Sequence, residues 1–411
     1  MFQALRIRDF RLLWAGGLVS SLGSWLLTLA IPTHIFLVTG SLRATGLTLA
    51  AEYLPLLVLG PVAGVFADRW DRRRLLIGTN LFCAGAVTVM LLGTAPGRYW
   101  VLYAALVAEN AGVVLNMPAW QARTPAIVGT GPLLSSANAL NSVSSGTVRL
   151  IGGPLGGILL AACGASWLIG IDAVSYLLSA AAMFMTSAAD REPEADDETS
   201  AIGTVARDLV HGARVLRRQP VARALLPVTV IFLAANAALT AMLIPLGVRR
   251  LGGTEHIGLL FSALGVGFLL AGPVLRTVLD RLQPRILLAA TLTATAAGQF
   301  VLFTSTSLAT ALPAGVAIGL FGSMSEVIPQ TAMQRIIQGA VLGRISAVFL
   351  TGEAAVGLAG AVAGPFLAQA IHLPGLAIVA SLLTLGAAAL SRLAVPRMAT
   401  VVPPPQVWPV T

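Results

Sequence analysis

Twelve long apolar runs constrain this chain of 411 residues more than any other feature. Each run has about 20 or more residues, which as a helix rising about 1.5 Å per residue crosses the roughly 30 Å hydrocarbon core of a bilayer. Helices satisfy their own backbone hydrogen bonds, so they are the structures that such runs form in lipid. The sequence therefore predicts an all-α, polytopic membrane protein with spans at 12–35, 44–67, 73–94, 100–119, 138–163, 166–188, 222–247, 256–279, 285–304, 306–330, 343–370 and 374–394.

Composition supports this class and excludes others. Hydrophobic residues make up 56% of the chain and charged residues only 10%, which is too little polar surface for a soluble globule. The net charge is +9, but every basic residue is an arginine and most lie between the apolar runs, so topology explains them better than nucleic-acid binding. Cys83 and Cys163 lie inside apolar runs, and neither they nor the four histidines have a metal-ligand spacing.

The arginines also predict the orientation of the spans. Loops on one side carry about five times as many arginines as loops on the other, and such loops are cytoplasmic. An even number of spans places both termini on that side of the cell membrane. The few arginines that fall on the opposite side are Arg43, Arg98, Arg249 and Arg250.

A long polar stretch divides the spans into six and six. The predicted organisation is an N-terminal six-helix bundle at 1–189, a cytoplasmic linker at 190–220, a second six-helix bundle at 221–396 and a cytoplasmic tail at 397–411. The two halves resemble each other, since the fifth and eleventh spans are both glycine-rich late in the span. A parallel repeat of this kind is typical of transporters that work by alternating access.

The loop after the second span carries a motif. Residues 64–74 read GVFADRWDRRR, and six charges in seven residues end the span, because each costs about 2.5 to 3.5 kcal/mol inside a bilayer. The stretch resembles the major facilitator superfamily signature G-x-x-x-D-R-x-G-R-R. Asp71 replaces the second glycine, as in the branch that contains the enterobactin exporter and the macrolide efflux pumps. The residues that match the signature are Gly64, Asp68, Arg69, Arg72 and Arg73.

Three further stretches are similar to the same branch: RDFRLLW at 8–14, PAWQ at 118–121, and NALN at 138–141. The resemblance implies the major facilitator fold, with two pseudo-symmetric six-helix bundles, and transport of cargo outward. It also implies that Asp68 latches the two halves in the outward-facing state, with Arg69, Arg72 and Arg73 as its partners. Plain topogenic charge is the alternative reading for Arg73.

Ionisable residues inside the spans are candidates for function because they are costly to bury. Glu109 and Arg149 both approach mid-bilayer on neighbouring spans, where they form either a proton relay or a fixed structural pair. Glu353 lies near the middle of its span without an evident basic partner, and is either a proton carrier or a protonated carboxyl bonded to backbone. Glu52 and Asp172 lie in the outer thirds of their spans, where water is near, and are expected to be structural or vestibular.

Two other groups of residues are candidates. The glycines and prolines of the fifth and eleventh spans permit either a rocking gate or close static packing; they are Gly152, Gly153, Pro154, Gly156, Gly157, Gly364 and Pro365. The candidates for lining a central cavity are Trp25, Asn110, Asn236 and Glu326. Trp14, Trp100, Trp120 and Trp167 are expected in the belts at the membrane interfaces.

These features predict a proton-coupled exporter of an amphipathic small molecule such as a drug, macrolide or siderophore. The expected surroundings are the lipid bilayer, a monomeric chain, no nucleic acid, and no cofactor or metal besides a proton gradient. An importer of a small metabolite and a channel or receptor remain alternatives. A membrane-embedded enzyme is a further alternative, but the sequence shows no cluster of acids with histidine and no nucleophile beside a base.

Overall fold

The computed structural model describes residues 2–95, 97–129, 131–187, 214, 216–253, 255–278, 281–336 and 340–396. Within these ranges, the side chains at 2, 64–69, 132, 149, 154, 161, 255, 334–336 and 340–347 are outside the description. The latch candidates Gly64, Asp68 and Arg69 and the candidates Arg149 and Pro154 are therefore placed only by their backbone.

The first half of the chain forms one bundle of long helices. Its elements are η1 (Phe2–Arg6), α1 (Arg8–Thr39), α2 (Leu42–Arg69), α3 (Arg72–Gly93), α4 (Tyr99–Val128), α5 (Pro132–Cys163) and α6 (Ala165–Phe184). α4 and α5 extend beyond the predicted spans that ended at 119 and began at 138, because helix continues past the apolar run into the polar segment.

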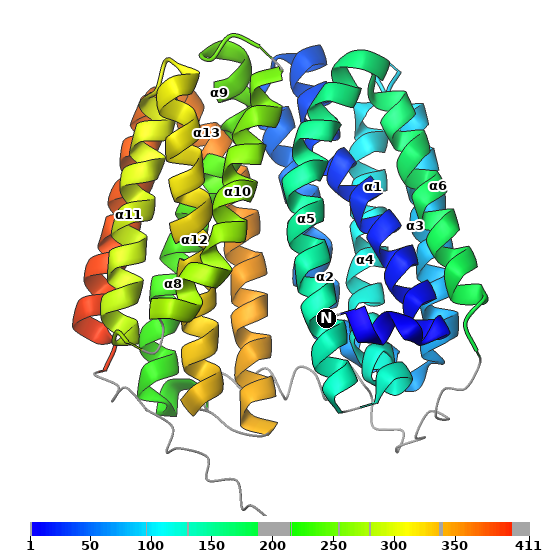
Figure 1. Ribbon diagram of the computed structural model, residues 1–411. Helices are drawn as coiled ribbons and strands as arrows, with labels where there is room; N and C mark the ends of the chain where they lie inside the picture. The colour runs from blue at the N-terminus through cyan, green and yellow to red at the C-terminus, as the bar shows by residue number, and fades with distance from the viewer. Residues whose placement is uncertain are drawn as a thin grey trace, which may run out of the picture.

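The second half forms the other bundle. Its elements are α8 (Pro220–Thr240), α9 (Leu243–Arg249), α10 (Glu255–Val278), α11 (Pro284–Thr304), α12 (Leu308–Ile336) and α13 (Ala340–Ala394). The predicted span 222–247 contains a break between α8 and α9. α13 is two antiparallel helices that meet at His372, whose φ of 59° is left-handed (Figure 1).

Eleven stretches of the described residues are long and apolar enough to cross a membrane, and the last of them is the double helix α13. The all-α fold with twelve spanning helices is therefore confirmed. Large apolar side chains on the outside also fit a lipid environment. Trp100 and Trp167 are each 68% exposed, as expected of interfacial tryptophans.

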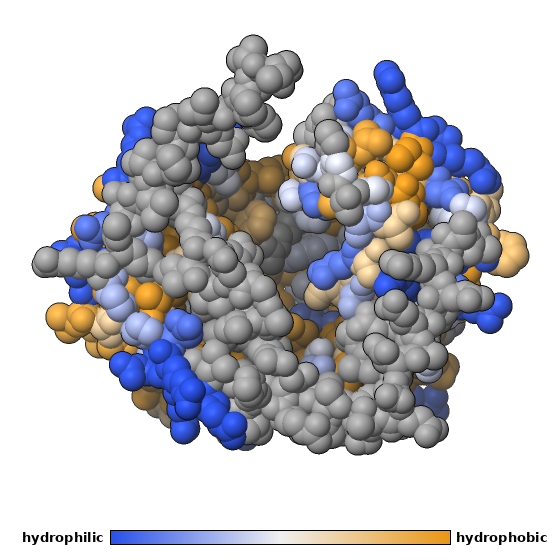
Figure 2. Space-filling view, turned by 90° about the horizontal axis from the view of Figure 1, so that it is seen from below, coloured by the Kyte–Doolittle hydropathy of each residue, from blue (hydrophilic) through white to orange (hydrophobic). Residues whose placement is uncertain are grey.

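The two bundles lie side by side (Figure 1), and they contact each other through α2 with α13 and through α5 with α10. We call the end where Ser187 and Leu216 lie the linker end, and the opposite end the distal end. At the distal end, Phe36 of α1 packs with Ile244 and Ile257 of the second bundle. Seen from the linker end, the surface is hollowed between the bundles (Figure 2).

Candidate functional site

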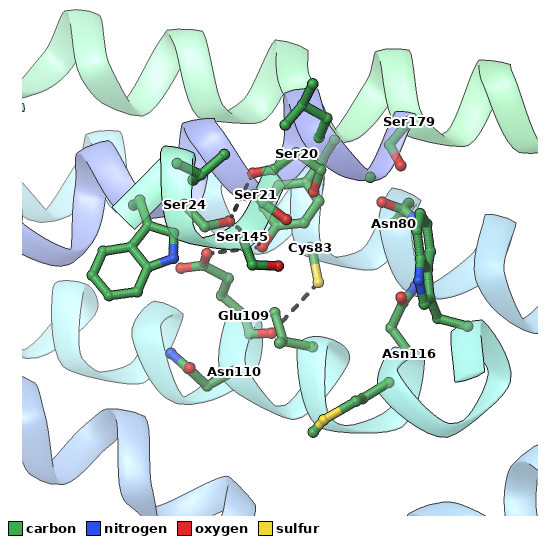
Figure 3. Close-up of a pocket in the computed structure, with 18 of the residues that line it drawn as sticks. Ser20, Ser21, Ser24, Asn80, Cys83, Glu109, Asn110, Asn116, Ser145 and Ser179 are labelled. Atoms are coloured by element: carbon green, nitrogen blue, oxygen red, sulfur yellow. Dashed lines mark hydrogen bonds between the residues drawn. The ribbon is translucent and has the colours of Figure 1, made fainter. Parts of the chain in front are cut away.

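Two adjoining cavities lie in the protein, one in the first bundle and one between the two bundles. Cavity 1 has a volume of about 540 Å³ and is lined only by residues of the first bundle, including Glu109, Asn110 and several serines (Figure 3). Cavity 2 has a volume of about 370 Å³ and is lined by both bundles, with Asn236 and Glu326 contributed by the second. The residues that line both cavities are Trp25, Thr28 and Glu52.

The four cavity candidates from the sequence, Trp25, Asn110, Asn236 and Glu326, thus all line a cavity. Trp14 and Trp120 were expected at the membrane interface, but both line cavity 1. The indole nitrogen of Trp14 donates a hydrogen bond of 2.9 Å to the Ser144 hydroxyl across α1 and α5, which explains why this indole turns inward.

Glu109 of α4 is the centre of a hydrogen-bonded group at the wall of cavity 1. Its carboxyl is only 5% exposed and accepts a hydrogen bond of 3.0 Å from the Tyr176 hydroxyl on α6. That hydroxyl is also 2.9 Å from the Ser24 hydroxyl on α1. The Cys83 thiol on α3 donates to the backbone carbonyl of Glu109 at 3.4 Å (Figure 3). Hydrogen bonds around Glu109 therefore join four helices, and the one to its carboxyl comes from Tyr176.

Asp172 lies behind the same wall and corrects a prediction. The sequence placed it near water, but its side chain is fully buried between α6 and α1. One carboxyl oxygen accepts a hydrogen bond of 3.0 Å from Ser175, and the other has no hydrogen-bond partner in the described part of the chain. Gly23 of α1 leaves the space that this carboxyl occupies, because any side chain at that position would overlap it.

No described basic side chain neutralises these acids. The ion pair found among the described residues joins Arg8 to Asp9 near the linker end, with 3.9 Å between the guanidinium nitrogen and the carboxylate oxygen. The expected pair of Glu109 with Arg149 falls on a side chain outside the description. Glu353 is half-buried on α13 and is not among the residues that line either cavity.

The described part of the motif loop places Arg73 and Asp71. Arg73 donates to the backbone carbonyls of Met183 and Phe184 and lies over the Phe184 ring at 5.4 Å, while its expected pairing with Asp68 falls on a side chain outside the description. It therefore ties α3 to the end of α6. Asp71 caps α3, since its carboxylate accepts a hydrogen bond of 2.6 Å from the backbone nitrogen of Arg74. Arg72 begins this helix, next to the cap.

The glycines of α5 and α13 allow close helix approach on two sides. Gly152 and Gly156 pack against Trp25 and Leu26 of α1, within the first bundle. Gly153 and Gly157 pack against Phe261 and Gly258 of α10, in the second bundle.

Within the second bundle, Gly364 of α13 packs against the backbone of Ala238 on α8. At the other interface between the bundles, Pro365 of α13 fits beside Gly46 of α2. Small residues thus bring the bundles together at both contacts, and their role in gating stays a prediction.

Reasoning from sequence missed Tyr176, Ser24 and Arg123. A tyrosine and a serine in apolar runs carry no signal of their own, and their contact joins helices far apart in sequence. Arg123 follows the predicted span 100–119 and so falls in a predicted loop, but it is 1% exposed and donates to the Thr186 hydroxyl and the Ser187 carbonyl, each at 3.0 Å. In the described part, no three His, Cys, Asp or Glu side chains gather as metal ligands.

Comparison with known proteins gives the same architecture. The model of a family described as transmembrane secretion effector matches residues 1–410. Macrolide efflux protein A of Streptococcus pyogenes is 27% identical over 283 residues, which is 68% of each chain. Enterobactin exporter EntS of Citrobacter koseri is 24% identical over 391 residues, which is 92% of this chain and 91% of the exporter.

Two solved structures share the fold at low identity. A POT family transporter in complex with a thioalcohol-conjugated peptide has a TM-score of 0.74 at 12% identity, covering 93% of this chain and 95% of its own. A D-xylose–proton symporter has a TM-score of 0.68 at 14% identity, covering 97% and 98%. At these identities the likeness shows the fold alone.

Proposed function

This chain belongs to the transmembrane secretion effectors, a family of major facilitator transporters, and we propose that it exports an amphipathic small molecule in exchange for protons. The family and its relatives are transporters rather than enzymes. The observation that carries the proposal is Glu109, a buried carboxyl on the wall of a large cavity with no described basic partner.

The lining of the two cavities supports an amphipathic cargo. Trp14, Trp25 and Trp120 offer aromatic faces, while serine hydroxyls and asparagine amides offer hydrogen bonds. Neither lining contains an arginine or histidine among the described residues, which disfavours a polyanion. The printed names of the relatives, macrolide efflux protein and enterobactin exporter, agree with export of a bulky small molecule.

Exchange follows from competition for one carboxyl. A carboxylate buried in low dielectric is costly without a counter-charge, and either a proton or a donor group of the cargo relieves that cost. If the two cannot bind Glu109 together, entry of a proton releases cargo and binding of cargo releases a proton. Glu353 is a second candidate carrier, and Asp68 stays the proposed latch between the bundles.

The direction of transport depends on which end of the protein faces the cytoplasm. Arginine-rich segments lie toward the linker end, which by the charge rule is cytoplasmic, in the cell membrane. The hollow seen in Figure 2 would then face the cytoplasm and load cargo from inside. Rocking of the two bundles about α2 with α13 and α5 with α10 would expose the same cavities at the distal end.

The test is flux of a labelled macrolide in proteoliposomes under an imposed pH gradient. We expect gradient-driven flux in the wild type. Glu109→Gln mimics the protonated carboxyl, so it should lose gradient-driven flux and bind the macrolide more weakly, with an affinity that no longer depends on pH. Glu353→Gln tests the second candidate carrier, which lines neither cavity, and Asp68→Asn tests the latch. Gradient-driven flux that survives in Glu109→Gln would contradict the coupling role, and flux only in the direction of proton entry would support an importer instead.

A further inference from the structure

Tyr176 links Glu109 to Ser24 at the wall of cavity 1, in a line of three hydrogen bonds. The Ser24 hydroxyl is 3.1 Å from the Ser20 carbonyl, the Tyr176 hydroxyl is 2.9 Å from Ser24, and the Glu109 carboxyl is 3.0 Å from Tyr176. All four residues line cavity 1, although Tyr176 is only 4% exposed. The line therefore connects a group that meets cargo to a group that can hold a proton.

The number of hydrogens sets the direction of this line. A hydroxyl has one hydrogen and two lone pairs, and an ionised carboxylate only accepts. With Glu109 ionised, Tyr176 donates to Glu109 and Ser24 donates to Tyr176. With Glu109 protonated, the carboxyl O–H can donate to Tyr176, Tyr176 then donates to Ser24, and Ser24 donates to the carbonyl of Ser20. Both directions use every hydroxyl hydrogen, so rotation of two hydroxyls suffices to interconvert them.

We propose that this line reverses when Glu109 takes up a proton, with Tyr176 as the positioning residue that transmits the change to Ser24 on α1. The proposal rests on the proton coupling proposed above and deepens it. In the ionised state, both lone pairs of the Ser24 oxygen are open to a donor group of the cargo. In the protonated state Tyr176 occupies one of them. Proton uptake thus weakens two cargo contacts rather than one.

Other titratable groups face Glu109 from the helices around it. They are Cys83 on α3, Asp172 on α6 and Glu52 on α2, while α1 contributes hydroxyls. α5 carries Arg149, whose side chain is outside the description. Because several of these groups could titrate, the test must assign its signal by substitution.

The test uses infrared difference spectra between acid and base, with the protein in liposomes and no cargo. We expect a carboxylic-acid C=O band on acidification that is lost in Glu109→Gln. Tyr176→Phe should shift this band to higher frequency, since it removes the hydrogen-bond partner of the acid, and Ser24→Ala should shift it by less. The matched control is Tyr103→Phe, which loses a bond of 3.0 Å to the Ala44 carbonyl and should leave the band in place.

The amide bands of the same spectra report whether each variant is folded. Ring-labelled tyrosine in the wild type gives a second readout, because reversal should change the C–O band of Tyr176 on acidification. An unchanged carboxyl band in Tyr176→Phe overturns the relay, as does a shift in Tyr176→Phe with none in Ser24→Ala. Absence of any Glu109 band overturns its titration, whereas macrolide flux under the pH gradient tests export separately.

An independent observation concerns the arginines at the distal end that break the charge rule. Arg43 of α2 lies over the ring of Phe366 on α13, 4.4 Å from its centroid. Arg249 of α9 lies over the ring of Phe36 on α1 at 5.1 Å and donates a hydrogen bond of 2.9 Å to the Gly40 carbonyl. Each bundle therefore places one arginine on a phenylalanine of the other. We infer that these two reciprocal contacts hold the distal end shut while the linker end is open.

Distances between two spin labels test this lock. The labels are attached at Val38 and Ser307, two exposed distal positions in different bundles, after Cys83 and Cys163 are replaced by alanine. The double variant Arg43→Gln with Arg249→Gln should raise the ratio of separated to closed distal ends about fivefold or more, given the usual strength of two cation–π contacts. Arg98→Gln, an exposed distal arginine, is the control. An unchanged distance distribution in the double variant overturns the inference.

Discussion

The two bundles share a frame, and they differ in what that frame carries. Thr79 is the eighth residue of α3 and bonds Asn116, the eighteenth of α4, at 2.7 Å. Thr291 is the eighth residue of α11 and bonds Ser325, the eighteenth of α12, at 2.9 Å. The same polar bond thus joins the same pair of helices at the same register in both halves.

One turn or two away, the halves diverge. The eleventh residue is Glu109 in α4 and Ile318 in α12, and Ile318 belongs to an apolar core cluster. The twelfth is Asn110, which lines cavity 1, and Gly319, which packs against the backbone of Leu264 on α10. Both pairs of positions line a cavity. The first bundle places polar side chains there, on cavity 1, whereas the second places an apolar side chain and a glycine there, on cavity 2, and the glycine also lets α10 approach closely.

The largest expected effect is at the twenty-fifth position, where α4 has Arg123 and α12 has Ala332. Arg123→Met should lower the free energy of unfolding by about 3 kcal/mol, because two hydrogen bonds from a buried charge are lost. Chemical unfolding in detergent measures the change. Arg276→Met, at an exposed arginine of α10, should change it by less than about 0.5 kcal/mol. Equal effects of the two substitutions would contradict a structural role for Arg123.

The next effect separates close helix packing from polar lining. Gly319→Ala should cost about 2 kcal/mol, since a methyl group there meets the Leu264 carbonyl and the helices must move apart. Asn110→Ala at the matching position should cost about 0.6 kcal/mol or less, the usual value of one side-chain bond within a membrane protein. Thermal unfolding of both variants checks the contrast. If Asn110→Ala proves the more destabilising, the proposed division of labour between the bundles is wrong.

The smallest effect should be equal in the two halves. Asn116→Ala and Ser325→Ala each remove one of the matched interhelical bonds, so each should cost about 0.6 kcal/mol. Unfolding measurements on the single variants and on the double variant would show equal and additive losses, because the two bonds lie in different bundles. A loss confined to one half would show that the shared register does not carry shared stability.

Much of the fold could be predicted from the sequence. Apolar runs near 20 residues specify spanning helices, and their even number with the arginine bias indicates the topology. The ends of individual helices were harder to predict. One residue, His372, separates the last two helices, and the run predicted as one span at 222–247 is broken before α9. Asp71 replaces the second glycine of the family signature, and the structure gives a local reason, because its carboxylate caps the start of α3.

Less of the site could be predicted. Costly charges inside apolar runs drew attention to Glu109, Asp172 and Glu52, and tryptophan depth drew attention to Trp25. The sequence could not indicate that Asp172 is sealed from water, because burial depends on how closely α1 approaches at Gly23. Nor could it distinguish the inward-facing Trp14 from the lipid-facing Trp100, since both lie near span ends.

The sequence by itself determined that this chain is a membrane protein of twelve helices in two similar halves, because hydrophobicity and charge along the chain decide what enters a bilayer. Only the tertiary structure decided that Glu109, Tyr176 and Ser24 meet at the wall of cavity 1. Those residues come from three helices, and their contact depends on the packing of α1, α4 and α6 rather than on any spacing along the chain.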